Sequence, residues 1–454
     1  MKNILNNQLG MKFAFVLFLF VLLQIPISMV SGLVSERSFR QEEVRNDIAR
    51  SSSGQQRILG PFILINYTET SHREGKTYLD KREKFILPTT FDLRADLDSF
   101  EKYRGIYQAR LYQAQTKLSG TFDFTELNAL RQHDIDKVSL VVGIQDSRGL
   151  LRLDDMTLAN LSLELEPGTG LNALPQGFHS QLNIDELDMS NPMAFDLNFL
   201  LQGMGQLQVT PIGHQSNVEL ASSWPHPSFI GDYLPISSDI SPEGFSATWS
   251  SNNFSTNIAQ LFQSCLADNN ACYELEQRQM GVDLIDPVDH YLKSHRAINY
   301  SLLVITLVFA SFFLLELFQA RPVHPVQYGF VGLALALFYL LLISMSEHIG
   351  FNWAYCVSAV ASTGLLSVYV SGMLNNPKHG GVFGASLLIL YGLLFGLLQA
   401  DSYALLMGTL LCFAILSFVM VVTRHVDWYA RSQSLLASNH KPHSTGEENG
   451  SNDK

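Results

Sequence analysis

The chain has 454 residues and a formal net charge of −12. This length allows a membrane bundle plus one or two soluble domains, and the negative charge argues against a nucleic-acid partner, because phosphate binding needs a basic surface. Long apolar stretches lie after Ala297, with one exception at the N-terminus. The composition therefore indicates a membrane protein with a large water-exposed segment.

The first apolar run, Phe13–Val30, follows Lys2 and Lys12. It can be read as a cleaved signal peptide or as an uncleaved anchor of about 18 residues, which is enough to cross a bilayer. The poor cleavage pattern favours a transmembrane anchor over residues 1–33. Opposite charges at helical spacing then predict a juxtamembrane helix within residues 34–56.

Residues 57–297 contain several rows in which apolar and polar residues alternate, a pattern typical of strands with one buried face. The rows are Val138–Ile144, Leu161–Leu165, Phe195–Leu201, Val218–Trp224 and Phe245–Trp249. Glycine- and proline-containing turns separate them. Many short strands joined by polar turns predict a β-rich domain with an antiparallel, sandwich-like fold.

Four cysteines are present. Cys265 and Cys272 would be about 10 Å apart on a continuous helix, too far for a disulfide, so a bond requires the segment between them to bend. The segment Asn269–Asn270 would permit such a bend. Cys356 and Cys412 lie in apolar runs, where buried and inert thiols are expected.

Five apolar stretches follow the β-rich domain and predict a helical bundle over residues 298–424. They are Ile298–Phe318, Val326–Met345, Phe351–Leu374, Val382–Ala400 and Ala404–Val422. The connectors are short, so neighbouring helices must be antiparallel. Residues 425–454 are polar and are expected to form a disordered cytoplasmic tail.

Basic residues set the expected orientation of these spans. One side of the predicted bundle carries Arg321, Lys378, Arg424 and Arg431, whereas the short loops on the other side carry Glu347 and Asp401. The N-terminal lysines lie on the basic side as well. Both termini are therefore predicted to be cytoplasmic, with the β-rich domain in the periplasm of a bacterial inner membrane.

Four polar side chains lie in or beside the apolar stretches: Glu316, Glu347, His348 and Asp401. A carboxylate inside a span is costly unless it is paired or hydrated, so such residues commonly mark ion paths. The alternative for Glu316 is a headgroup-level pair with Arg321, and for Glu347 and His348 a solvated loop cap. The two interpretations of Glu316 stay open on sequence alone, whereas the solvated loop cap is favoured for Glu347 and His348.

A possible contact motif of the periplasmic domain comprises Trp224, Pro225, His226 and Phe229. His226 and Ser228 resemble a nucleophile pair, but sequence assigns them no orienting carboxylate, and a stiff turn that seats the aromatic rings in a core is favoured. The chain contains no G-x-S-x-G, H-E-x-x-H or C-x-x-C pattern. No enzyme activity, metal or cofactor is therefore predicted.

Six motifs occur in a fixed order: Asp146-Ser147-Arg148-Gly149, Glu166-Pro167-Gly168-Thr169-Gly170-Leu171, Trp224-Pro225-His226-Pro227-Ser228-Phe229, His324-Pro325-Val326-Gln327-Tyr328, Ser346-Glu347-His348-Ile349-Gly350-Phe351 and Asp427-Trp428-Tyr429-Ala430. In this order and architecture the sequence resembles the CreD family, the cell-envelope-integrity inner membrane proteins of Gram-negative bacteria. The resemblance runs from the N-terminal anchor to about Arg431. It implies no catalytic residue or ligand.

The resemblance implies a role in envelope integrity and in the response to envelope stress. The large soluble domain favours a mechanism in which that domain contacts an unknown periplasmic or envelope protein, while the lipid bilayer surrounds the helices. The alternative is an ion-coupled transporter or channel-like device that uses the polar groups of the bundle.

Overall fold

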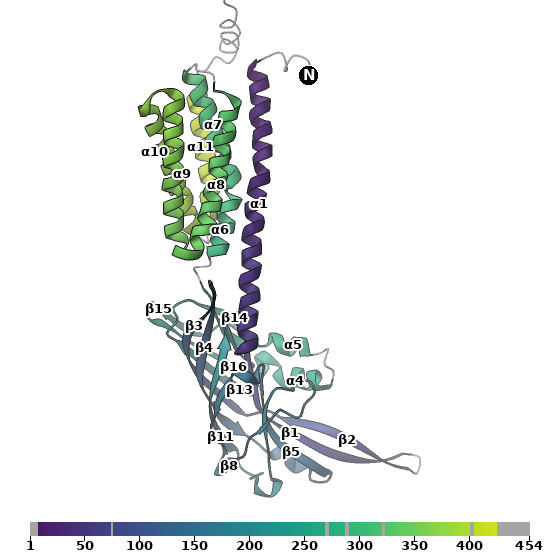
Figure 1. Ribbon diagram of the computed structural model, residues 1–454. Coiled ribbons are helices and arrows are strands. Elements are labelled where there is room, and N and C mark those ends of the chain that lie inside the picture. The colour runs from purple at the N-terminus through teal and green to yellow at the C-terminus, as the bar shows by residue number, and fades with distance from the viewer. Residues whose placement is uncertain are drawn as a thin grey trace, which may run out of the picture. The chain divides into compact units, whose positions relative to one another are not determined.

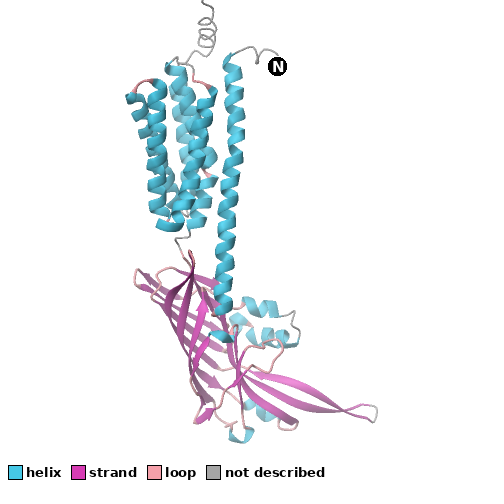
Figure 2. Cartoon of the chain, in the orientation of Figure 1, coloured by secondary structure: helices cyan, strands magenta, loops and turns pink. Residues whose placement is uncertain are grey.

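The computed structural model describes residues 8–73, 76–267, 272–286, 290–319, 323–399 and 404–424. The chain divides into two compact units. Met1–Phe39 and Val288–Lys454 form one, called here the helical unit, and Arg40–Pro287 form the other, called the β-rich unit. Figure 2 shows the helices and strands of each.

Helix α1 (Gln8–Ser51) joins the predicted anchor and juxtamembrane helix into one element of 44 residues. Such a helix is about 66 Å long, roughly twice the hydrocarbon thickness of a bilayer. Its final turns belong to the β-rich unit, where Ile48 packs with Ala109 and Leu111. The apolar run and the polar segment after it therefore form a single helix.

The first sheet of the β-rich unit has eight strands in the order β14-β17-β12-β1-β5-β10-β9, with β2 paired to β1. Its strands are β1 (Gln56–Arg73), β2 (Lys76–Ile86), β5 (Asp134–Ile144), β9 (Glu166–Pro167), β10 (Gly177–Gln181), β12 (Gln206–Val209), β14 (Pro227–Gly231) and β17 (Met280–Leu284). Figure 1 shows the β1–β2 hairpin extending beyond β5 as a two-stranded arm, consistent with β5 pairing that stops at Thr68.

The second sheet has nine strands in the order β15-β16-β13-β3-β4-β11-β7-β8, with β6 paired to β11. Its strands are β3 (Thr90–Arg104), β4 (Tyr107–Phe122), β6 (Leu150–Leu153), β7 (Met156–Leu158), β8 (Leu161–Leu163), β11 (Met193–Met204), β13 (Gln215–Ser222), β15 (Ser237–Ser241) and β16 (Gly244–Asn252). Buried residues of both sheets form one hydrophobic core, and Phe178 of the first sheet meets Phe199 of the second edge-on at 6.4 Å between ring centroids.

Most strand pairs are antiparallel, as the sandwich prediction requires, but two are parallel. Strand β12 runs parallel to β1, and β13 runs parallel to β3. Parallel neighbours cannot be joined by a tight hairpin and need a long connection between them. Strands β12 and β13, which lie on either side of residue 210, therefore pair with strands that precede them in the chain by more than 100 residues.

The burial pattern confirms the alternation predicted for β11 and β16. It corrects the prediction for Val138–Ile144, because that part of β5 is buried on both faces rather than one. Strand β5 lies between β1 and β10 in the sheet, and its polar position Ser139 is buried too. Trp224 lies beyond the end of β13 and is not part of that strand.

The β-rich unit also has four short helices: α2 (Thr125–Leu130), α3 (Asn253–Thr256), α4 (Ile258–Ala267) and α5 (Cys272–Gln277). Phe262 of α4 packs edge-on against Phe62 of β1 and Phe85 of β2, with ring centroids 4.8 and 5.4 Å away. Helix α4 ends at Ala267 and α5 begins at Cys272 as a separate element. Cys265 is disulfide-bonded.

The helical unit contains α6 (His290–Asn299), α7 (Ser301–Gln319), α8 (Pro325–Ile349), α9 (Phe351–Leu374), α10 (Pro377–Gln399) and α11 (Ala404–Thr423). Among the described residues, α1, α8, α9 and α10 are each long and apolar enough to cross a membrane. Helices α6 and α7 qualify only as a pair bent by 42°.

The predicted number of five C-terminal spans is therefore wrong for the described residues, where three helices qualify individually. The 42° bend lies at the start of the first predicted stretch, and α7 (Ser301–Gln319) covers that stretch apart from its first three residues. The last stretch is helical as α11 but is not among the qualifying helices. The polar tail, residues 425–454, lies outside the described residues.

Large apolar side chains cover the outer faces of α8, α9 and α10, as expected for helices that face lipid. Leu337, Val360 and Ile389 are 51, 64 and 65% exposed. Cys356 and Cys412 are free and exposed, so the prediction that both are buried is wrong. An apolar stretch in a membrane helix turns part of its surface outward to lipid instead of into a protein core.

Candidate functional site

The Asp146-Ser147-Arg148-Gly149 motif forms a polar network at the point where α1 ends. Asp146 accepts hydrogen bonds from the backbone N–H of Gly54 at 2.9 Å and from Nε and Nη2 of Arg148 at 2.9 and 2.7 Å. Arg148 also donates to the carbonyl oxygen of Arg50 in the last turn of α1. Donation from Arg148, aided by the Gly54 N–H, holds the pKa of the Asp146 carboxyl below its usual value.

Gln56 extends the network into the start of β1. Its side-chain amide donates to the carbonyl oxygens of Asp146 at 3.0 Å and Gln202 at 2.8 Å, and Ser53 donates to the same Gln202 oxygen at 2.9 Å. Gly149 fits here because a Cβ at that position would overlap the Gln202 oxygen and the Gln56 amide. The motif therefore fastens the end of α1 to the β-rich unit and carries no reactive group.

Trp224 stacks beneath a cation. The Arg110 guanidinium carbon lies 3.4 Å from the centroid of the Trp224 ring, and the indole N–H donates to the Ile285 carbonyl oxygen at 3.0 Å. Arg110 is 11% exposed and also pairs with Glu101. A partly desolvated cation–π contact of this kind strengthens the packing of the loop between β13 and β14.

The remaining residues of that motif do not form a catalytic group. His226 packs against Trp224 at 5.5 Å between ring centroids. Phe229 packs edge-on against Trp249 at 5.6 Å. Asp232 forms an ion pair with Arg278 at 3.2 Å, so its carboxylate is engaged away from His226. The geometry favours the stiff, aromatic-seating turn over a nucleophile pair.

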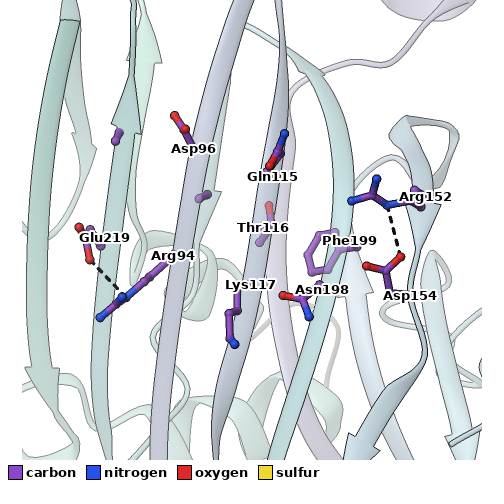
Figure 3. Close-up of a pocket in the computed structure, with 12 residues that line it drawn as sticks. Arg94, Asp96, Gln115, Thr116, Lys117, Arg152, Asp154, Asn198, Phe199 and Glu219 are labelled. Carbon is purple, nitrogen blue, oxygen red and sulfur yellow. Dashed lines mark ion pairs between the residues drawn. The ribbon is translucent and has the colours of Figure 1, made fainter.

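A polar trough crosses the outer face of the second sheet and was not predicted from the sequence. It has a volume of about 510 Å³ and is lined by Arg94, Ala95, Asp96, Gln115, Thr116, Lys117, Arg152, Asp154, Asn198, Phe199, Glu219 and Ala221. Figure 3 shows these side chains arising from neighbouring strands. Alternation was predicted from the sequence for β11 and β13 but not for β3 and β4, and the lateral order that brings these outward positions together could not be read from the sequence.

Ion pairs organise the trough across the strands. Arg94 of β3 pairs with Glu219 of β13 at 3.3 Å (Figure 3), and Lys117 of β4 pairs with Asp196 of β11 at 2.8 Å. Cross-strand pairs of opposite charge contribute roughly 0.2–1 kcal/mol each. Asp96 and Gln115, which are paired across β3 and β4, present an exposed acceptor and an exposed amide. The surface can therefore donate and accept hydrogen bonds over an area spanning several strands.

Glu347 is held by two partners within the helical unit. Its carboxylate accepts a hydrogen bond from the Tyr291 hydroxyl at 3.1 Å and lies 3.5 Å from Nε of Arg37. The Glu347 side chain is 10% exposed. These two contacts connect α6 and α1 to α8. They differ from the solvated loop cap considered for Glu347, because the carboxylate is largely enclosed and bonded.

The other predicted polar groups do not gather around Glu347 in the described part of the chain. His348 is exposed at the end of α8. Glu316 lies in α7, but its side chain is outside the described set, as are Arg321 and Asp401. Among the residues described, no group of three or more His, Cys, Asp and Glu side chains is placed to hold a metal ion.

Sequence reasoning also missed a row of buried hydroxyl groups in the helical unit. Tyr355 of α9 donates to the backbone carbonyl of Tyr391 in α10 at 2.8 Å. Ser362 lies 3.2 Å from the Tyr391 hydroxyl. The signal was present as tyrosine, serine and threonine at helical spacing in an apolar stretch, where such side chains commonly bond across helices.

Residues 8–429 match the protein family described as "Inner membrane protein CreD". The Escherichia coli K12 protein of that name is 35% identical over 418 residues, which cover 91% of this chain and 92% of the relative.

Solved structures give only weak similarity. Two structures of a mutant M1 zinc metallopeptidase from Deinococcus radiodurans, one of them bound to a Tyr-Ser-Ala substrate, align with TM-scores of 0.18 and 0.19. They are 10 and 11% identical, cover 36% of this chain, and are themselves covered over 39 and 38%. A similarity at this level carries no argument about fold or function.

Proposed function

Because the chain belongs to the CreD family of inner membrane proteins, we propose that it supports the integrity of the cell envelope through contacts made by its β-rich unit. The chain is a multi-pass membrane protein with several apolar helices. The proposal assigns the specific work to the soluble unit and gives the helices the task of retaining that unit at the membrane.

The distribution of charge supports a periplasmic location for the β-rich unit. Lys378 and Arg424 follow α9 and α11, whereas Glu347 lies at the far end of α8. Short loops rich in Lys and Arg stay in the cytoplasm. With α9 ending on the cytoplasmic side, α8 ends on the periplasmic side, which is also where the polar second half of α1 leaves the membrane.

The polar trough of Figure 3 is the observation that carries the proposal. Its lining offers both donors and acceptors, and most of its charged side chains are held in pairs rather than concentrated in one sign. Such a surface suits a polar protein or cell-wall segment laid across the strands, and it does not suit a strongly anionic polymer. The partner proposed is thus a neutral or mixed-charge component of the envelope.

The test fills the trough without disturbing the core. Gln115 is exposed in the lining, and a tryptophan there would occupy part of the 510 Å³ while suiting a β-strand. We expect Gln115→Trp to fail in complementing an envelope-defective strain at normal membrane levels. The matched control is Gln215→Trp, at an exposed strand position outside the lining. Full complementation by Gln115→Trp would refute the proposal.

The second candidate, ion-coupled transport, draws support from the enclosed Glu347. Tyr291 and Arg37 both contact this carboxylate and hold it in place, which favours a structural clamp over ion transport. Transport predicts a flux of protons or cations in proteoliposomes containing the purified protein, and loss of that flux in Glu347→Gln. Proteoliposomes with no flux above protein-free vesicles would remove this candidate.

A further inference from the structure

Helices α8, α9 and α10 enclose a set of hydroxyl groups, called here the hydroxyl cluster. Its members are Tyr339, Tyr355, Ser358, Ser362, Thr363 and Tyr391. All are buried, with exposures of 7% or less. Tyr355, Ser358 and Ser362 are three and four residues apart on α9, so they lie on one face of that helix.

The members converge from three helices. Phe338 of α8 stacks on Tyr391 at 4.5 Å and meets Tyr355 edge-on at 5.7 Å, which places the adjacent Tyr339 beside them at 4.9 Å from Phe338. The Tyr339 side chain is 1% exposed, so its hydroxyl lies inside the helical unit.

Only half of the cluster is satisfied by protein. Tyr355, Ser362 and Tyr391 bond to one another as described above, whereas the hydroxyl oxygens of Tyr339, Ser358 and Thr363 are fully enclosed and have no hydrogen-bond partner among the described residues.

Other hydroxyls in the same unit bond within their own helix. Thr306 donates to the Leu302 carbonyl at 2.7 Å and Ser311 to the Leu307 carbonyl at 2.8 Å. That local solution is common for serine and threonine in apolar helices. The hydroxyls of Ser358 and Thr363 make no such bond within α9, so they are available to bond another molecule.

A buried hydroxyl with no partner is costly, and an apolar residue of the same shape would avoid the cost. Three such groups on two helices that pack together, α8 and α9, therefore indicate a ligand. The cluster holds no carboxylate, amine or imidazole, so it suits a neutral molecule that both donates and accepts. Water meets this description, since a buried water typically makes two to four hydrogen bonds.

We propose that the hydroxyl cluster is a buried water-binding site inside the helical unit. Ordered water bridges the hydroxyls of Tyr339, Ser358 and Thr363, and joins them to the bonded chain of Tyr355, Tyr391 and Ser362. The site makes the interior of this apolar bundle locally polar. It is independent of the trough and of the envelope function proposed above.

The first test is radiolytic footprinting of the full-length protein in nanodiscs, read by mass spectrometry. Hydroxyl radicals form from water at the site where it is bound, so a tyrosine in contact with internal water is oxidised despite its burial. We expect Tyr339 to be modified several-fold faster than Tyr328. Tyr328 is an equally buried tyrosine of α8 whose ring packs against Phe309 and Phe312. Equal rates at the two positions would overturn the proposal.

The second test uses the sign of a stability change. If the hydroxyls hold water, Ser358→Ala and Thr363→Val break its bonds, and the unfolding temperature in nanodiscs falls. If they lie in a dry interior, removing them relieves an unsatisfied group, and the temperature rises or stays the same, which contradicts the proposal. Thr306→Val is the control, because its hydroxyl is exposed and bonded within α7, so a small change there is expected in either case.

Discussion

At the scale of single residues, the best-defined feature is the polar network around Asp146. Its carboxylate is bonded to Arg148 in a two-pronged arrangement and to the Gly54 N–H. The Gln56 amide ties the same loop to Gln202. Charge-assisted bonds of this type are roughly twice as strong as neutral ones, and breaking a buried network is a recognised cause of large destabilisation. Two predictions concern this network.

Replacing Gly149 should destabilise the β-rich unit. In Gly149→Ala the new methyl group would overlap the Gln202 carbonyl oxygen and the Gln56 amide, so the backbone must shift. We expect a loss of about 1–3 kcal/mol in the free energy of unfolding, the usual cost of overpacking. Chemical denaturation of the full-length protein in nanodiscs measures it. In the control Gly54→Ala the Cβ would meet its nearest neighbour at an ordinary 3.7 Å.

Acid should weaken the same network. Because the pKa of Asp146 is lowered by folding, the ionised form contributes stability above the unfolded pKa of about 3.9. That contribution is lost as the pH falls through the lower, folded pKa. We expect the difference in unfolding temperature between wild type and Asp146→Asn to be largest near neutral pH and to shrink in acid. A difference independent of pH would contradict this assignment.

At the scale of elements, α4 covers the face of the β1–β2 hairpin where the strands leave the core. Phe262 fills the space between Phe62 and Phe85, and all three rings meet edge-on. An isolated two-stranded ribbon is marginally stable in water. The root of this hairpin therefore depends on the helix that packs against it.

Truncating the ring should show this dependence. We expect Phe262→Ala to lower the free energy of unfolding by about 3–5 kcal/mol, the range for a large buried side chain. It should also increase protease cleavage within the hairpin. Phe254→Ala provides a matched control, because Phe254 lies nearby in α3 and is fully exposed. Similar losses in both variants would mean that α4 packing is not responsible.

Local patterns explain how much of this architecture the sequence could predict. Period-two alternation identified β11 and β16, because each exposes one face. It misread β5, whose central position buries both faces, and it could not reveal that β12 pairs with β1 or β13 with β3. Lateral order depends on contacts between residues far apart in the chain. The trough and the hydroxyl cluster depend on that order or on helix packing, and were missed for this reason.

At the scale of the whole molecule, the two units have contrasting surfaces. The helical unit exposes large aliphatic side chains on α8, α9 and α10. The β-rich unit exposes paired charges on its second sheet. Membrane retention and polar recognition therefore reside in different parts of the chain, and the two parts can be altered separately.

A complementation experiment can assign the function to one unit. One variant carries Glu316→Gln, Glu347→Gln and His348→Ala together, and the other replaces residues 57–250 with a neutral linker. We expect the triple substitution to complement an envelope-defective strain and the replacement to fail, with membrane levels checked by immunoblot. The reverse outcome would transfer the function to the helical unit and favour transport.

The placement of β17 has a consequence for how the protein is made. This strand is the last of the β-rich unit along the chain, yet it lies between β12 and β14 within the first sheet. Because synthesis starts at the N-terminus, β12 and β14 each have an unpaired edge until β17 has been made. Unpaired strand edges can form hydrogen bonds with other chains and so promote aggregation. Closure of the sheet is therefore postponed until the chain has been extended almost to α6. A newly made protein needs protection from aggregation throughout that interval, and the need ends only as the apolar helices emerge.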